Sequence, residues 1–249
     1  MNRPVFRKPG AARALRWEAA GLAWLAAADA LPVVDVLDIA DDHLDLAALT
    51  SVTPTAAAAR TFGAGLARLH DAGADAFGAP PPGWDGDGFI GRCPLVSASF
   101  ETWGEYYARA RLSPIGEALR ATGDLPPEAA ADLDRLTARL CAGDLDDDDP
   151  PARLHGDLWS GNVMWTAAGA TLIDPAAHGG HRETDLAMLA LFGLPHLDAV
   201  VAGYQSVHRL RPGWRHRTGL HQLFPVGVHA VLFGGGYVAQ THALLRRWA

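Results

Sequence analysis

The sequence contains little cysteine and almost no lysine. Only two cysteines, Cys93 and Cys141, occur in 249 residues, and their spacing matches no thiolate metal site. Neither a disulfide framework nor a cysteine-ligated metal is indicated, and a reducing, cytoplasmic compartment is expected. Lys8 is the single lysine among 21 basic side chains, so a site that needs a compact ammonium group must use Lys8.

Long apolar runs and an excess of positive charge are also missing. The formal net charge is −7, which argues against nucleic acid as a partner, since a nucleic-acid groove normally needs a basic face. The alanine-rich stretch 19–34 is interrupted by Asp29 and Pro32, so it is not a membrane span, and residues 1–10 hold no apolar signal core. We expect a soluble protein without a membrane partner; the composition leaves its oligomeric state open.

The N-terminal segment has the pattern of a strand followed by an amphipathic helix. Residues 4–8 predict a short strand, and Leu15, Leu22 and Leu25 recur at helical spacing. Glu18 lies on the same stripe, so its carboxylate should face inward and needs a cationic partner. Lys8, on the preceding strand, is the candidate partner.

Two further runs, 31–40 and 43–49, flank Asp41 and predict a hairpin that completes a small sheet. From residue 53 onward the pattern is mainly helical. The sequence therefore predicts an α+β fold with two lobes, 1–52 and 53–249. The acidic run 144–149 is typical of a solvated loop and is assigned no function.

The segment RLHGDLWSGNVMWTAAGATLIDP contains three polar residues that point to chemistry. Asp157 and Asn162 are separated by the D-x-x-x-x-N spacing, in which the Asp can accept a hydroxyl proton while the Asn binds a metal. Two short apolar strands follow, and a hairpin centred near Ala168 would place Asn162 opposite Asp174. An amide oxygen and a carboxylate opposed in this way could share one magnesium ion.

These residues predict a phosphoryl-transfer site. Asn162 and Asp174 would hold magnesium against the phosphates of ATP, while Lys8, paired with Glu18, would neutralise phosphate charge. Asp157 would orient the acceptor hydroxyl. His155 would brace the loop by hydrogen bonding, because Asp157 already supplies a base. The other histidines are expected to be structural or exposed, and a zinc site is not expected.

At these residues the sequence resembles the fructosamine kinase, or ketosamine kinase, family, whose fold is similar to that of aminoglycoside phosphotransferases and protein kinases. The resemblance rests on several segments. They are FGAGLARLHDAG (62–73), GDGFIG (86–91), the Trp103 to Pro114 pattern, LHGDLWSGN (154–162), DPAAHGGHRETDLAMLALFG (174–193), PGWRHRTGLHQLF (212–224) and LFGGGY (232–237).

The resemblance implies ATP with magnesium, and phosphorylation of a hydroxyl on a fructosamine, ribulosamine or erythrulosamine, free or attached to a protein amine, as deglycation repair. It implies Asp157 as base, Asn162 and Asp174 as metal ligands, and Asp185 as a brace of the catalytic loop. Asp185 has a second interpretation, because an acidic residue also stabilises a helix N-terminus. The side-chain chemistry of Trp214 and Arg215 suits a sugar pocket, and the same residues could instead pack the terminal helices.

The sequence departs from the family pattern at its start. Family members normally carry two strands and a phosphate-covering loop before the lysine strand, whereas seven residues precede Lys8 here. The N-terminal lobe is therefore expected to be incomplete, either as a true feature or because the start lies within a longer product. Two alternatives stay open: a weakly catalytic nucleotide-binding member of the family, and a kinase for another small alcohol, such as an aminoglycoside or choline.

Overall fold

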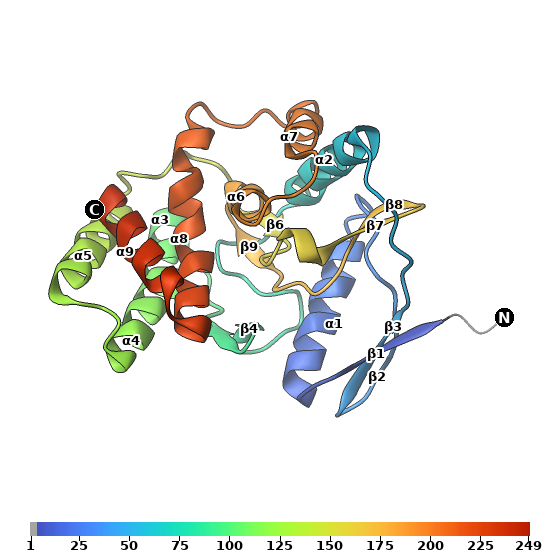
Figure 1. Cartoon of the computed structure of the whole chain (residues 1–249), viewed down its shortest axis with the longest axis horizontal. Coiled ribbons are helices and arrows are strands. Elements are labelled where there is room, and N and C mark those ends of the chain that lie inside the picture. Colours follow the sequence, from blue (N-terminus) through green and yellow to red (C-terminus); the bar gives the residue numbers. More distant parts are fainter. Residues whose placement is uncertain (1–3) are drawn as a thin grey trace.

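The computed structural model describes residues 4–249 and combines a small sheet-containing lobe with a larger, mainly helical one, as the α+β prediction requires (Figure 1). The small lobe contains β1 (Val5–Pro9), α1 (Ala12–Ala26), β2 (Val36–Ile39) and β3 (His43–Ala47). The larger lobe contains α2 (Ala56–Asp71), β4 (Gly88–Ile90), β5 (Cys93–Leu95), α3 (Trp103–Tyr106), a π-helical segment (Tyr107–Leu112), α4 (Ser113–Thr122), α5 (Pro127–Cys141), β6 (Ala152–Leu154), a 3₁₀ turn (Ser160–Asn162), β7 (Val163–Thr166), β8 (Gly169–Leu172), β9 (His178–Gly180), α6 (Glu183–Leu191), α7 (Leu197–Gln205), α8 (Trp214–Phe233) and α9 (Gly236–Trp248).

The small lobe is an antiparallel sheet of order β1-β3-β2 packed against α1. Side chains on one face of β3, Leu44 and Leu46, are buried against Leu15 and Leu22 of α1. The alternation of apolar residues along the strand and their helical spacing in α1 make the two buried faces meet. The predicted strand, helix and hairpin are all present.

Backbone pairing joins the small lobe to the β7–β8 hairpin. The amide of Val34 donates to the carbonyl of Leu172 at 3.0 Å, and the amide of Leu172 donates to the carbonyl of Pro32 at 2.9 Å. These bonds satisfy backbone groups at an otherwise open edge of the hairpin. They also fix the position of β1 and α1 relative to the residues that follow β8.

Two further apolar clusters form the core of the larger lobe. One lies among α3, α4, α5, α8 and α9, and the other joins α2, α6 and α7 to the β7–β8 hairpin. Figure 1 shows the short strands β6 and β9 between helices α8 and α9 on one side and the small lobe on the other. The loop after β6 therefore lies at the centre of the molecule. No helix within residues 4–249 is long and apolar enough to cross a membrane.

Candidate active site

The loop after β6 brings Asp157 and Asn162 together. The side-chain amide nitrogen of Asn162 donates to the backbone carbonyl of Asp157 at 2.8 Å and to its Oδ2 at 3.1 Å. The 3₁₀ turn at the end of the loop folds the chain back so that residues five apart can make both contacts. The D-x-x-x-x-N spacing thus corresponds to a direct contact.

Asp185, in the first turn of α6, fixes this loop through hydrogen bonds from its backbone. Its Oδ2 accepts the backbone N–H of His155 at 2.8 Å, and its Oδ1 accepts that of Gly156 at 3.0 Å. His70 of α2 contacts the same carboxylate, with 3.2 Å between Nε2 and Oδ2. Burial alone would raise the pKa of Asp185, but the hydrogen bonds outweigh it and lower that pKa. Asp185 is therefore an ionised, fully buried acceptor for two loop amides.

His155 links the loop to the strand that precedes Asp174. Its Nε2 donates to the carbonyl of Ile173 at 2.9 Å, and its Nδ1 accepts the amide of Asp157 at 3.3 Å. The acceptor and donor roles assign the Nε2–H tautomer. Burial lowers the pKa of His155, which keeps the ring neutral and preserves this pattern.

Asp157 is a carboxyl group in a strongly perturbed environment. Burial, followed by the negative charge of Asp174, raises its pKa to about 7, although the hydrogen bond from Asn162 acts in the opposite direction. A carboxylate with this pKa can take up a proton near neutral pH. Such a shift, caused by burial together with a nearby charge, is typical of functional sites.

The hairpin that follows Asn162 differs from the predicted register by one residue. Strand pairing runs from Val163 with Leu172 to Thr166 with Gly169, so Asn162 lies opposite Ile173 and not opposite Asp174. The turn contains two residues, shorter than the prediction assumed, which shifts every pair.

Asp174 reaches the site by another route. It adopts a left-handed backbone conformation with φ of 56°, and its carbonyl lies 3.4 Å from the amide nitrogen of Asn162. This conformation is uncommon for residues other than glycine, although aspartate tolerates it better than most. It turns the chain after β8 and brings the Asp174 carboxylate to Lys8.

Lys8 pairs with two acids from different parts of the fold. Its ammonium nitrogen lies 2.7 Å from Oε2 of Glu18 on α1, the predicted partner, and 2.5 Å from Oδ1 of Asp174. Burial disfavours the charge of Lys8, but hydrogen bonds to Asp174 and Glu18 outweigh it and raise its pKa. Burial also raises the pKa of Glu18, against the effect of Lys8. Lys8 and Glu18 thus form an ion pair that is partly shielded from water.

A cavity of about 340 Å³ opens beside this cluster, within the usual range for small-molecule sites. Its charged end is formed by Lys8, Glu18 and Asp174. The rest of the lining is mainly apolar and comes from both lobes: Phe6, Val34, Leu46, Ala47, Ala48, Leu49, Met164 and Ile173.

The side chains at the charged end suit a divalent cation. The carboxylate of Asp174 is half exposed, and among the described residues its side chain pairs with Lys8 alone. The side-chain oxygen of Asn162 accepts no hydrogen bond from residues 4–249, because the contacts of this amide all use its nitrogen. Carboxylate and amide oxygens are the ligands that magnesium prefers. These oxygen donors would therefore suit a divalent cation such as magnesium.

Trp214 and Arg215 lie at the start of α8, away from these groups. The guanidinium carbon of Arg215 is 4.4 Å from the centroid of the Trp214 ring, and Trp214 packs against the cluster around α7. In the part of the chain that the structure describes, no hydrogen bond, ion pair or ring contact joins either residue to the 155–162 loop. The structure thus does not bring this predicted pair together with Asp157.

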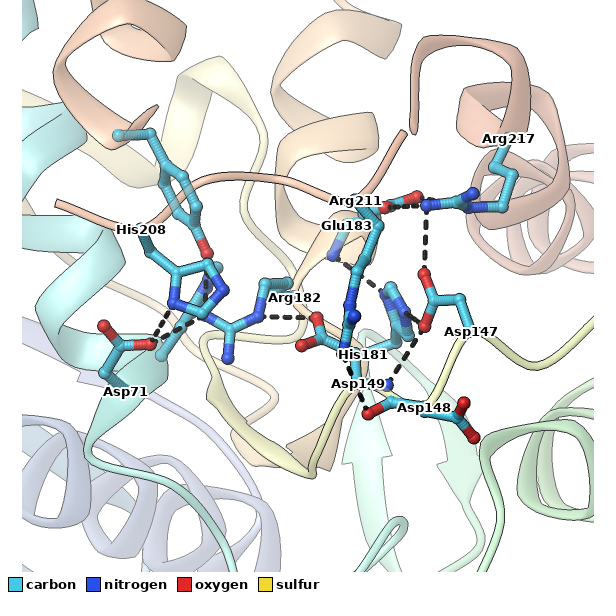
Figure 2. Close-up of polar contacts among 12 residues, drawn as sticks. Asp71, Asp147, Asp148, Asp149, His181, Arg182, Glu183, His208, Arg211 and Arg217 are labelled. Atoms are coloured by element: carbon cyan, nitrogen blue, oxygen red, sulfur yellow. Dashed lines mark hydrogen bonds and ion pairs between the residues drawn. The ribbon is translucent and has the colours of Figure 1, made fainter. Parts of the chain in front are cut away.

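The acidic run 144–149 was expected to be solvated, and this expectation is wrong for two of its residues. Figure 2 shows Asp147 between His181 and Arg217, and the structure gives 3.0 Å for each contact. Asp149 is buried and accepts from Nε of Arg182 at 2.7 Å. Tertiary contacts with basic groups stabilise these carboxylates, which composition alone could not reveal.

The same network contains a metal-like arrangement of His181, Glu183 and His221, whose ligand atoms lie within 4.8 Å of one another. Arg217 already occupies the acidic side of this group, with Nε 3.0 Å and Nη2 2.5 Å from the Glu183 carboxylate. The bidentate guanidinium neutralises the Glu183 carboxylate, which would otherwise be available to bind a metal ion. We interpret the network as an anchor between α6 and α8.

Comparisons with known proteins agree with this geometry. The model of the fructosamine kinase family matches residues 5–249. A Thermobifida fusca structure described as a fructosamine-3-kinase has a TM-score of 0.90 and 43% identity, covering 98% of this chain and 85% of that one. An aminoglycoside phosphotransferase structure, at 17% identity and a TM-score of 0.63, covers 99% of this chain and 88% of its own and shows the shared protein-kinase-like fold.

A Synechocystis protein described as a ketoamine kinase is 35% identical over 189 residues, which cover 75% of this chain and 60% of the relative. The matched part therefore spans less than two thirds of that relative's length. The family match over residues 5–249 and the likeness to the Thermobifida fusca structure nevertheless extend over almost the whole chain. The chain belongs to the fructosamine kinase family.

Proposed function

We propose that this chain transfers a phosphoryl group from ATP to a sugar hydroxyl of a ketosamine, as a step in deglycation repair. Family membership and the relatives described as ketoamine and fructosamine-3-kinases support this choice of substrate. The observation that carries the proposal is a chain of direct contacts that ends at the charged end of the cavity. It runs from Asp157 through Asn162 to Asp174 and Lys8.

Asp157 is proposed as the catalytic base. Its Oδ2 is held by Asn162, and a pKa of about 7 lets the carboxyl group accept the proton of the acceptor hydroxyl near neutral pH. The loop that carries Asp157 is fixed by Asp185 and His155, so little conformational freedom is lost when the acceptor is positioned. In this proposal Asp185 and His155 are positioning residues.

Asn162 and Asp174 are proposed to hold magnesium, which would neutralise charge on the phosphates of ATP. Lys8 supplies a further positive charge at the same end of the cavity, and Glu18 holds its side chain in place. The apolar walls, drawn partly from the proposed nucleotide-binding lobe 1–52, suit the adenine ring. Nucleotide and acceptor would then meet at the 155–162 loop.

Product identification tests the proposal. The purified chain would be incubated with ATP, magnesium and one acceptor at a time, and mass spectrometry with phosphorus NMR would locate any new phosphate ester. The panel should contain ribulosamines, erythrulosamines and fructosamines, with an aminoglycoside and choline as competing acceptor classes. A phosphorylated ketosamine supports the proposal. Exclusive phosphorylation of another acceptor, or nucleotide binding without any product, contradicts it.

A further inference from the structure

A row of aromatic rings runs from the 155–162 loop to the junction of α8 and α9. Trp159, two residues after Asp157, contacts Phe192 at the end of α6, with 5.8 Å between ring centroids. The Phe192 ring lies 5.1 Å from His229 of α8. His229 in turn lies 5.5 Å from Phe233 and 5.0 Å from Tyr237. The row therefore connects the candidate catalytic loop with the outer surface.

The aromatic side chain at the outer end of this row is largely exposed to solvent. Phe233 is 65% exposed, more than any other large hydrophobic side chain described, and Trp159 at the inner end is 38% exposed. A single exposed apolar residue needs no explanation, but contiguous aromatic surface leading from a candidate active site does. The other rings of the row, Phe192, His229 and Tyr237, are half-buried and keep part of their surface accessible.

Local backbone geometry fixes the outer pair. Gly234 and Gly235 have φ of 65° and 59°, and this turn ends α8 and reverses the chain into α9. The reversal brings Tyr237 back to Phe233, with 6.4 Å between ring centroids. His229 is held by a 2.7 Å hydrogen bond from Nδ1 to the carbonyl of Pro225. The rings are thus presented by two helix ends and do not depend on a long loop.

We infer that Phe233 and Tyr237 form an outer subsite for the group carried on the amine nitrogen of the ketosamine. This inference rests on the proposed function. With the reacting hydroxyl at Asp157, the row of contacting rings gives the amine substituent an apolar path outward. Aromatic faces bind both hydrocarbon and a neighbouring ammonium group. The chain should therefore favour ketosamines of aromatic or long aliphatic amines over those of small polar amines.

A substrate series with one sugar tests the subsite. Ketosamines of methylamine, hexylamine and benzylamine would be compared in wild type, Phe233→Ala and Phe233→Tyr. We expect Phe233→Ala to raise KM for the benzylamine adduct about 3- to 10-fold, with a change below about 2-fold for the methylamine adduct, as one aromatic contact predicts. Phe233→Tyr keeps the ring and should restore the benzylamine KM. Val207→Ala, at another exposed apolar position, is the matched control.

Calorimetric binding of the same adducts separates this inference from the proposed function. Selective binding of the benzylamine adduct, lost in Phe233→Ala but without turnover, would overturn the proposed catalysis and retain the subsite. Turnover of all three adducts with equal KM in wild type and Phe233→Ala would overturn the subsite and retain the catalysis. Failure of every adduct to bind overturns both. A change of oligomeric state in Phe233→Ala without a change in selectivity would assign the patch to a second copy of the chain, against the inference.

Discussion

The ammonium nitrogen of Lys8 lies 2.5 Å from Oδ1 of Asp174. Lys8 belongs to the first strand of the small lobe, whereas Asp174 follows the β7–β8 hairpin of the larger lobe. Their contact connects the two lobes at the charged end of the cavity. The buried Glu18 on α1 holds Lys8 from the other side, which makes the position of this lysine sensitive to both partners.

Replacement of Lys8 should destabilise the fold through Glu18. Lys8→Met leaves the Glu18 carboxylate buried without its partner, and we expect the free energy of unfolding at pH 7.5 to fall by about 2 kcal/mol. Lys8→Met combined with Glu18→Gln removes the uncompensated charge and should recover much of that loss. Urea denaturation of both single variants and the double variant measures the coupling. Additive effects would show that the pair is not coupled.

Gly156 should be intolerant of any side chain. Its φ is 81°, and a Cβ at this position would lie 2.1 Å from the carbonyl oxygen of Ala176. Gly156→Ala should therefore displace the 155–162 loop, lower the unfolding temperature and remove most activity. Gly123 has the same φ with no atom within 4 Å, so Gly123→Ala should cost only about 1 kcal/mol for its left-handed backbone. Equal effects of the two substitutions on turnover would exclude close packing at Gly156 as the cause.

Much of the site could be predicted because its chemistry is local in sequence. The D-x-x-x-x-N spacing brings Asp157 to Asn162 through one turn, and the apolar stripe of α1 orients Glu18 toward Lys8. The hairpin register was wrong by one residue because the turn length was not encoded in the apolar pattern, and the left-handed conformation of Asp174 had no sequence signal.

Contacts between distant segments were harder to predict. The partners of the acidic run come from the start of α6 and from α8, more than thirty residues away, so composition suggested solvent exposure. From the sequence, Trp214 and Arg215 at the start of α8 could either line a sugar pocket or pack the terminal helices, and this stays a prediction. The opposite end of this helix carries His229, whose ring row reaches the 155–162 loop. Which end faces the loop depends on packing against α6, which helical periodicity alone does not specify.

Ionisation of Asp157 should lower the free energy of unfolding as the pH rises. Its pKa is about 7 in the folded chain against 3.8 as the ordinary value, so its protonated form is favoured by folding. This stabilisation is complete below about pH 4 and is lost as the pH rises through 7. Asp157→Asn should therefore be more stable than wild type by roughly 2–4 kcal/mol at pH 8, with a difference near zero at pH 4. Chemical denaturation at both pH values checks this; a pH-independent difference would contradict the raised pKa.

Asp174→Asn should alter the response to magnesium. The substitution removes a negative charge from the proposed metal site and reduces its attraction for a divalent ion. We expect the magnesium concentration for half-maximal nucleotide binding to rise at least about 10-fold, measured by calorimetry with an ATP analogue. Asp198→Asn, an exposed acid in the first turn of α7, is the control. An unchanged magnesium dependence would remove Asp174 from the metal site.

The most direct test of the account is ADP release from ATP and magnesium with a ketosamine acceptor, measured for wild type and Asp157→Asn. We predict ADP formation that depends on the ketosamine and falls at least about 100-fold in the variant, with nucleotide affinity largely kept. Turnover by Asp157→Asn at the wild-type rate, or ADP formation that ignores the acceptor, would contradict it.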